Sequence, residues 1–331
     1  MSAGDKDAPV RDVAVVGLGN QGGEHVRALA ATRLPLRLAA AVDLRGAPSD
    51  LALPEHCPVF SSITELPESV GAVIVATPPM TYRSIVPDLL ESGRHVLLEK
   101  PLGVDLTEAL RLVEKAEERD RVLMPAVQRR FHPTYRQWAE WREKVGRLRE
   151  ALIYMSIRHA GEEWRASLAE AGGGALFDLG FHAIDLAQQL FGDLRLQVSF
   201  FFDREGRPCH DGFDFEADML LLSETGVTVR LHVARAASAK KEEVVVRGDR
   251  GTLEIGRDRL RFTNSENEVQ EMTADSSWAK AMEAQMHFWH GAMRTKEGGQ
   301  AADEAPHDIP AWNGVSAMRM MEEAYGHGRC S

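Results

Sequence analysis

Residues Arg11–Asp43 read RDVAVVGLGNQGGEHVRALAATRLPLRLAAAVD, and this stretch decides the fold of the N-terminal half. An apolar run leads directly into Gly17-Leu18-Gly19-Asn20-Gln21-Gly22, a helical pattern follows, and a second apolar run ends on Asp43. A strand, a G-x-G-x-x-G turn, a helix and an acid about 20 residues further on form the fingerprint of a dinucleotide site. The alternative is a glycine-rich turn in an ordinary α/β domain.

Each glycine of this turn has a separate predicted role. Gly17 permits the tight turn, Gly19 lets the backbone approach a pyrophosphate, and Gly22 lets helix and strand pack closely. The pyrophosphate is expected at the helix N-terminus, where N–H groups and the helix dipole favour negative charge. Asp43 is expected to bind the ribose 2′-OH and so to favour NAD over NADP, although Arg45 offsets part of the repulsion of a 2′-phosphate.

Length and composition narrow the class of protein. A chain of 331 residues favours two domains, and a formal net charge of −11 argues against a nucleic-acid partner. The three cysteines are scattered, with neither disulfide nor metal-ligand spacing, so no metal is expected. The first residues lack the apolar core of a signal peptide, and no apolar run reaches membrane-spanning length. A cytoplasmic protein with no membrane partner is the expectation.

The pattern of apolar and polar residues changes after Arg129. Before it, short Val- and Leu-rich strands alternate with helices, which predicts a Rossmann domain: a doubly wound parallel sheet covered on both faces. After it, alternating strands and turn residues predict an α+β domain with an open-faced, mostly antiparallel sheet. We therefore expect a dinucleotide-binding domain over residues 1–128 and a substrate-binding and oligomerisation domain over residues 129–331.

Individual elements can be placed within these two domains. The expected strands are Val13–Val16, Leu38–Val42, Val70–Ala76, His95–Leu98, Val122–Ala126, Leu148–Arg158, Leu194–Asp203, Asp214–Leu222, Val227–Arg235, Glu242–Arg247 and Gly251–Ile255. The expected helices include Tyr82–Ser92, Asp105–Arg119, Pro133–Lys144, Ala279–Thr295 and Ile309–Tyr325. The aromatic and methionine cluster at Met282–Trp289 is interpreted as helix core.

One candidate chemical group follows a predicted parallel strand. Glu99-Lys100-Pro101 lies where such a strand ends, and ligands bind outside the carboxyl ends of these strands. A partly desolvated lysine there can donate a hydrogen bond or a proton to a carbonyl oxygen. Pro101 is a candidate for a cis bond. The plainer interpretation is an exposed lysine at a strand end.

A second candidate follows the glycine run at residues 172–174. If the next segment is helical, Asp178, His182 and Asp185 lie on one face, where a carboxylate can orient an imidazole for acid/base work. Gly180 costs about 1 kcal/mol relative to alanine in a helix, so close approach of a nicotinamide ring is one reason for it. The alternatives are a solvated polar stripe and a metal site, which the lack of a second histidine at ligand spacing disfavours.

Arginines near the domain junction and before the glycine run form a third group. Arg129, Arg130 and the Trp164-Arg165 pair could present guanidinium groups to an anionic or hydroxylated substrate. Junction arginines also commonly make interdomain ion pairs. The substrate residues proposed on this basis are Arg130, Arg158, Trp164 and Arg165.

In this order, GLGNQG, Asp43, ATPP, EKP and GGxxxDxGxHxxD resemble the glucose-fructose oxidoreductase, inositol dehydrogenase and rhizopine-catabolism protein (Gfo/Idh/MocA) family. The resemblance spans nearly the whole chain. It implies NAD or NADP bound between a Rossmann domain and a C-terminal domain whose open sheet mediates homodimers or homotetramers. By the same resemblance, Lys100, Asp178 and His182 are catalytic, and Pro101 matches a proline that is often cis. The chain departs from the family at Tyr82, where many members carry histidine.

The resemblance and the motifs together give one functional hypothesis. The chain is expected to be an NAD(P)-dependent oxidoreductase that moves hydride between nicotinamide and a hydroxyl or ketone of a sugar, cyclitol or related small molecule. The rivals are a family member that uses NAD transiently for hydrolysis or elimination, and a non-catalytic dinucleotide-binding regulator. The expected cofactor-binding residues are Gly17, Gly19, Asn20, Gln21, Gly22, Asp43, Arg45, Thr77, Pro78, Pro79, Tyr82, Glu99, Lys100 and Gln128.

Overall fold

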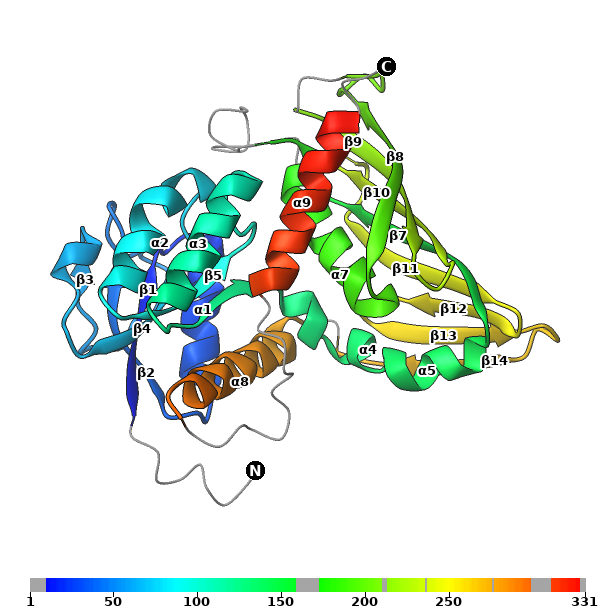
Figure 1. Ribbon diagram of the computed structural model, residues 1–331. Coiled ribbons are helices and arrows are strands. Elements are labelled where there is room, and N and C mark those ends of the chain that lie inside the picture. The colour runs from blue at the N-terminus through cyan, green and yellow to red at the C-terminus, as the bar shows by residue number, and fades with distance from the viewer. Residues whose placement is uncertain are drawn as a thin grey trace. The chain divides into compact units, whose positions relative to one another are not determined.

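The computed structural model describes residues 10–158, 173–209, 213–235, 237–275, 277–298 and 311–327. The chain divides into two compact units, shown in Figure 1. The first unit comprises Met1–Ala126 and Met282–Val315, and the second comprises Val127–Ala281 and Ser316–Ser331. The domain boundary expected after residue 128 lies close to the observed change of unit after Ala126. The expectation did not include residues 282–315 in the first unit.

The first unit contains a parallel sheet of six strands in the order β3-β2-β1-β4-β5-β6. Its strands are β1 (Arg11–Val16), β2 (Leu36–Val42), β3 (Val59–Phe60), β4 (Val70–Val75), β5 (His95–Glu99) and β6 (Leu123–Ala126). The central strands are buried along almost their whole length, as a sheet covered on both faces requires. The predicted doubly wound domain is therefore confirmed. Only the two-residue strand β3 was not predicted.

Amphipathic helices cover this sheet. They are α1 (Asn20–Ala31), α2 (Tyr82–Glu91) and α3 (Leu106–Glu118), with 3-10 turns η1 (Ile63–Glu65) and η2 (Pro79–Thr81). Asp105 caps α3 by accepting a 2.7 Å hydrogen bond from the Glu108 N–H. Ala109, Leu112 and Val113 form the buried stripe of that helix. The ends of α3 thus follow from its capping residue and its apolar period.

Helix α8 (Ala279–Lys296) begins in the second unit and runs within the first from Met282 onward. Met282, Met286, Trp289 and Met293 are buried along it, which confirms that this cluster is helix core. Just after it, Glu297 accepts a 3.0 Å hydrogen bond from His95, whose other ring nitrogen accepts the Val122 N–H at 3.0 Å. These bonds assign the proton to Nε2 of His95, and burial lowers the pKa of this imidazole.

The second unit contains a sheet of eight strands in the order β14-β13-β12-β11-β7-β10-β9-β8. Among the described strand pairs of this sheet, β7/β10 alone is parallel. The strands are β7 (Leu148–Ser156), β8 (Leu194–Phe202), β9 (Glu216–Ser223), β10 (Thr228–Ala234), β11 (Lys241–Gly248), β12 (Gly251–Ile255), β13 (Arg259–Asn264) and β14 (Val269–Thr273). The predicted, mostly antiparallel sheet is confirmed, and β13 and β14 extend it beyond the predicted strands.

Buried and half-exposed residues alternate along strands such as β9, so one face of this sheet is packed and the other is not. The helices described for the second unit are α4 (Pro133–Arg136), α5 (Trp138–Val145), α7 (Phe181–Phe191), the start of α8 and most of α9 (Ala311–His327). A 3-10 turn η3 (Gln128–Phe131) and a π turn η5 (Leu176–Gly180) accompany them. Helix α5 packs on β11, β12 and β13, and α7 packs on β7, β8 and β10 (Figure 1). The single helix expected over residues 133–144 is two helices. Along the described ranges, no helix combines the length and apolar character that crossing a membrane requires.

Candidate active site

The turn between β1 and α1 has the geometry that its glycines predict. Gly17 has a φ of +89°, and a Cβ there would lie 2.7 Å from the Ala76 carbonyl oxygen. A Cβ on Gly22 would overlap the Gly17 carbonyl oxygen, so Gly22 is fixed by helix–strand packing. A Cβ on Gly19 would meet no atom within 4 Å. The backbone at Gly19 is therefore open to close approach, as a pyrophosphate needs.

The N-terminus of α1 is suited to an anion. Helix α1 starts at Asn20 with Gly19 as its N-cap, and no side chain caps it. No acidic residue stands in its first turn, and the side chains of Asn20 and Gln21 are exposed. Backbone N–H groups at such a helix start carry the positive end of the helix dipole. The residues present therefore fit a dinucleotide pyrophosphate.

Asp43 lies at the end of β2, directly beside this turn. Its Oδ2 accepts a 2.8 Å hydrogen bond from the Leu18 N–H, and its Oδ1 accepts a 2.9 Å bond from the Arg45 N–H. The carboxylate is thereby held at the glycine-rich turn, while the Arg45 side chain is exposed. Leu44, which none of the sequence motifs includes, lies between these two residues in the chain and is 88% exposed. An apolar residue between the two charged ones was the available signal.

The loop after β4 completes this edge of the sheet. Thr77 hydrogen-bonds Thr81 through their hydroxyl groups at 2.7 Å, and Thr81 donates to the Pro78 carbonyl at 2.8 Å. Pro78 is exposed, whereas Pro79 is buried at the start of η2.

Tyr82 requires a correction. Its side chain is fully buried, and burial together with Glu99 and Glu108 raises the pKa of its hydroxyl well above the usual value. Tyr82 therefore supports the loop from inside the first unit, and its side chain is not placed to contact a cofactor.

Glu99 and Lys100, which are neighbours at the end of β5, have different surroundings. Glu99 is 5% exposed, and its Oε1 lies 2.8 Å from Nε2 of the fully buried His25 on α1. Its carboxylate therefore faces the interior, which corrects the expectation that it contacts a cofactor. Lys100 is half-buried at the carboxyl end of the strand, and the Lys100–Pro101 bond is cis, as predicted.

The second unit carries the other two predicted catalytic residues. Asp178 lies within the π turn η5, and His182 lies in the first turn of α7 with 7% exposure. Such π turns inside helices are frequent at functional sites. A Cβ on Gly180 would collide with the Leu176 side chain, whose Cγ would lie 3.1 Å away. Packing against the buried Leu176 side chain therefore favours glycine at this position of the π turn.

Asp185 does not join Asp178 and His182 as a reactive group. It is 2% exposed, and its carboxylate binds Arg130, with Nη2 to Oδ1 at 2.8 Å and Nε to both oxygens at 2.9 Å. Arg129 likewise binds Glu242 at 2.9 Å. These arginines form ion pairs within the second unit, which corrects both the interdomain alternative and the assignment of Arg130 as a free substrate ligand.

The remaining predicted residues are scattered. Gln128 is 9% exposed, and its Oε1 is a buried acceptor with no donor among the described residues, which fits a ligand N–H. Arg158 is exposed beyond the end of β7. Trp164 and Arg165 lie outside the described residues. Lys100 belongs to the first unit, and Asp178 and His182 belong to the second.

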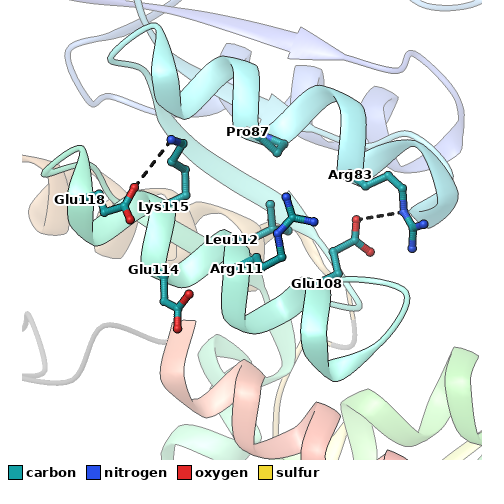
Figure 2. Close-up of a pocket in the computed structure, with 8 residues that line it drawn as sticks. All are labelled: Arg83, Pro87, Glu108, Arg111, Leu112, Glu114, Lys115 and Glu118. Carbon is teal, nitrogen blue, oxygen red and sulfur yellow. Dashed lines mark ion pairs between the residues drawn. The ribbon is translucent and has the colours of Figure 1, made fainter.

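A groove on the surface of the first unit is a different kind of feature. It runs between α2 and α3 and is lined by Arg83, Pro87, Glu108, Arg111, Leu112, Glu114, Lys115 and Glu118 (Figure 2). Arg83 pairs with Glu108 at 3.7 Å, and Lys115 pairs with Glu118 at 3.7 Å. Because the charges of these pairs compensate one another, the groove has no evident preference for a charged ligand. Among the described side chains, no cluster of three His, Cys, Asp or Glu could hold a metal ion.

Comparison with known proteins agrees with these features. A model of an oxidoreductase family with an NAD-binding Rossmann fold matches residues 11–127, and a model of the GFO/IDH/MocA C-terminal domain matches residues 139–254. An inositol 2-dehydrogenase 2 of Paenarthrobacter aurescens (strain TC1) is 26% identical over 327 residues, which cover 93% of each chain.

A dTDP-3,4-didehydro-2,6-dideoxy-alpha-D-glucose 3-reductase of Actinomadura kijaniata is 31% identical over 167 residues, which are 50% of this chain and 49% of the reductase. The chain thus spans about half to two thirds of the length of several curated relatives.

A solved structure of levoglucosan dehydrogenase with NADH and levoglucosan has a TM-score of 0.79 and 18% identity, covering 96% of this chain and 97% of that one. This likeness concerns the fold. Because family models match the glycine-rich Rossmann half as well as most of the open-sheet half, the chain belongs to the GFO/IDH/MocA oxidoreductase family.

Proposed function

We propose that this protein is an NAD(P)-dependent dehydrogenase or reductase acting on a hydroxyl or ketone group of a sugar, a cyclitol or a related small molecule. The observation that carries the proposal is that one member of this family has both a dinucleotide edge and a set of acid/base residues. The dinucleotide edge is the carboxyl edge of the first sheet, with the glycine-rich turn of residues 17–22, Asp43 and, at the end of β5, Lys100. The acid/base residues are Asp178 in the π turn η5 and His182 in α7. Relatives named for inositol and dTDP-sugar substrates support the substrate class.

The first unit would hold the cofactor through the groups described above. Backbone N–H groups at the start of α1 would bind the pyrophosphate, and Asp43 would bind the adenosine ribose. The exposed Leu44 would lie against the adenine. When bound, the nicotinamide supplies the hydride acceptor or donor. A carboxylate already held at the turn favours NAD, whereas the exposed Arg45 leaves NADP as a weaker ligand.

The chain's own residues would handle the substrate proton. Lys100, half-buried at the end of β5, would donate a hydrogen bond to the reacting substrate oxygen. His182 would take up or release the hydroxyl proton, and Asp178 would orient its imidazole. The proposal therefore requires the Lys100 ammonium and the His182 imidazole to reach one and the same substrate.

A second copy of this chain is the proposed protein partner. The face of the second sheet opposite α5 and α7 carries half-exposed apolar residues, including Leu152, Leu220, Val245 and the 55% exposed Phe200. A face of this kind supports a homodimer or a homotetramer. Sedimentation of the wild type and of Phe200→Glu tests this, because the variant should shift the protein to smaller species.

Purified protein should be mixed with NAD or NADP and a panel of inositols, aldoses and nucleotide sugars, and followed by nicotinamide absorbance. Calorimetric titration should give tighter binding of NAD than of NADP, and Asp43→Ser should weaken NAD by about tenfold, the loss of roughly one charge-assisted hydrogen bond. Lys100→Ala should lower turnover by a larger factor than it weakens NAD binding. The absence of turnover on every substrate of the panel, or turnover that Lys100→Ala leaves at the wild-type level, would contradict the proposal.

A further inference from the structure

The start of the segment that carries Asp178 is held by a residue far away in the chain. The Leu176 N–H donates a 2.8 Å hydrogen bond to Oδ2 of Asp214, and the Ala175 N–H donates a 2.7 Å bond to the Asp214 backbone carbonyl. Asp214 is 1% exposed, so this contact is shielded from water. The first N–H groups of a helix have no partner within the helix. Asp214 supplies that partner from outside.

A second distant residue reaches the same point from α9. The Tyr325 hydroxyl donates a 2.8 Å hydrogen bond to Oδ1 of Asp214. Each carboxylate oxygen of Asp214 therefore has its own donor. Asp214 therefore binds the backbone at the N-terminal side of η5, and the Tyr325 hydroxyl in turn binds the Asp214 carboxylate.

Helix α9 is itself anchored beside Tyr325. The Ser199 hydroxyl donates to the Ala324 carbonyl at 2.8 Å, and the Phe201 ring stacks on the Tyr325 ring with centroids 4.9 Å apart and planes at 21°. Both partners lie on β8. The phenol is therefore fixed by the sheet, and it can act as a rigid donor.

Asp214 is tightly packed against Gly174, so its carboxylate has little room to move. A Cβ on Gly174 would overlap both the backbone and the carboxylate of Asp214. Burial raises the pKa of Asp214 to about 6, while the Leu176 N–H, the Tyr325 hydroxyl and the charge of Arg235 act in the opposite direction. The glycine run is thus explained in part by close contact with a buried carboxyl group.

We propose that Asp214 and Tyr325 are positioning residues that fix the π turn Leu176–Gly180 and so set the directions of Asp178 and His182. The inference rests on the proposed function, in which those two side chains act on the substrate. A π turn is a rare conformation that needs support from its surroundings. The hydrogen bonds at its start supply that support, and small misplacements of acid/base groups lower turnover strongly.

The test uses the full chain with saturating NAD and the variants Tyr325→Phe, Asp214→Leu and Asp214→Asn. Hydrogen exchange of the amides over residues 173–182 should rise in the first two variants, and kcat should fall by about tenfold, with the NAD dissociation constant unchanged. Asp214→Asn keeps one acceptor for the Leu176 N–H, so its exchange and its kcat should stay near those of the wild type.

Tyr135→Phe is the matched control, because Tyr135 is 1% exposed and donates to Oε1 of the buried Glu242 at 3.0 Å. Its removal should leave exchange over residues 173–182 unchanged. Equal exchange in Tyr325→Phe and Tyr135→Phe would overturn the inference. If no substrate is turned over, the proposed function fails, and the exchange measurement still decides whether Asp214 and Tyr325 fix the turn.

Discussion

The two units build their candidate sites in different ways. In the first, backbone groups of one short turn and one aspartate 25 residues from Leu18 form the dinucleotide edge. In the second, the turn that carries Asp178 depends on Asp214, 38 residues beyond Leu176, and on Tyr325, 111 residues beyond Asp214. A site made of backbone geometry leaves a compact motif in the sequence. A site held by distant side chains does not.

The largest effect is expected at His182. Its substitution should change turnover, which depends on the second unit, without changing NAD affinity, which depends on the first. His182→Gln should lower kcat by about a thousandfold, because the proton-transfer group is lost. The affinity for NAD should stay the same, since the dinucleotide edge lies in the first unit. Stopped-flow turnover and calorimetric titration measure the two quantities. A parallel loss of NAD affinity would break the comparison.

Arg130 tests whether the second region is held by buried ion pairs. Arg130→Met leaves the Asp185 carboxylate, with a side chain 3% exposed, without its cation. Unfolding of the variant should require about 3 kcal/mol less, as expected when one partner of a buried pair is removed. Chemical denaturation followed by fluorescence gives this value.

Arg207→Met is the control for this experiment, because Arg207 pairs with Asp203 at 2.8 Å while its side chain is 71% exposed. It should change the stability little. Equal effects of the two substitutions would show that burial does not matter at Arg130.

Gly17 tests the backbone character of the first region. Gly17→Ala should weaken NAD binding by about a hundredfold, because a side chain is strained at a φ of +89° and would meet the Ala76 carbonyl. Gly226→Ala has a similar φ of +82° with no atom within 4 Å of the added Cβ, and it lies in the β9–β10 turn. That control should leave NAD affinity unchanged. A titration in which both variants bind NAD like the wild type would contradict the role of the turn.

The smallest expected effect concerns pH and the second region. Because the folded-state pKa of Asp214 is raised from 3.8 to about 6, its contribution to stability is full below pH 3.8 and is lost as pH rises through 6. Between pH 5 and pH 8 the loss should be about 1.4 kcal/mol, one pKa unit. Arg235 and Tyr325, which face this carboxyl group, keep the loss from being larger.

Asp214→Asn should flatten this pH dependence when unfolding free energies of variant and wild type are compared at the two pH values. An unchanged pH dependence in the variant would assign the effect to other groups. That outcome would concern the second unit alone, because the Asp43 site of the first unit does not include Asp214.

The sequence predicted the first unit closely and the second only in outline. The Val-rich runs gave five of its strands, and the glycine turn with Asp43 gave the edge. Strand β3 was missed because two residues carry no periodic signal. In the second unit β13 and β14 were missed. Strand β14 (VQEMT) shows no alternation, whereas Arg259-Leu260-Arg261-Phe262 of β13 alternates over only four residues.

The predicted site residues divide along the same line. Gly17, Gly19 and Asp43 have the expected geometry because local backbone conformation determines it. Tyr82 and Glu99 turn out to be interior residues, since burial depends on the elements packed over them. The partner of Arg130 could not be read from its surroundings in the chain, because Asp185 is 55 residues away.

The sequence by itself determined the alternation of strands and helices in the first unit, the glycine-rich turn and the acid at the end of β2, because these depend on residues that are close together in the chain. Only the tertiary structure decided which charged side chains are buried in pairs, why Gly174 must lack a side chain, and what holds the π turn around Asp178. The physical reason is that burial and hydrogen-bond partners of a side chain are set by segments that meet only after folding.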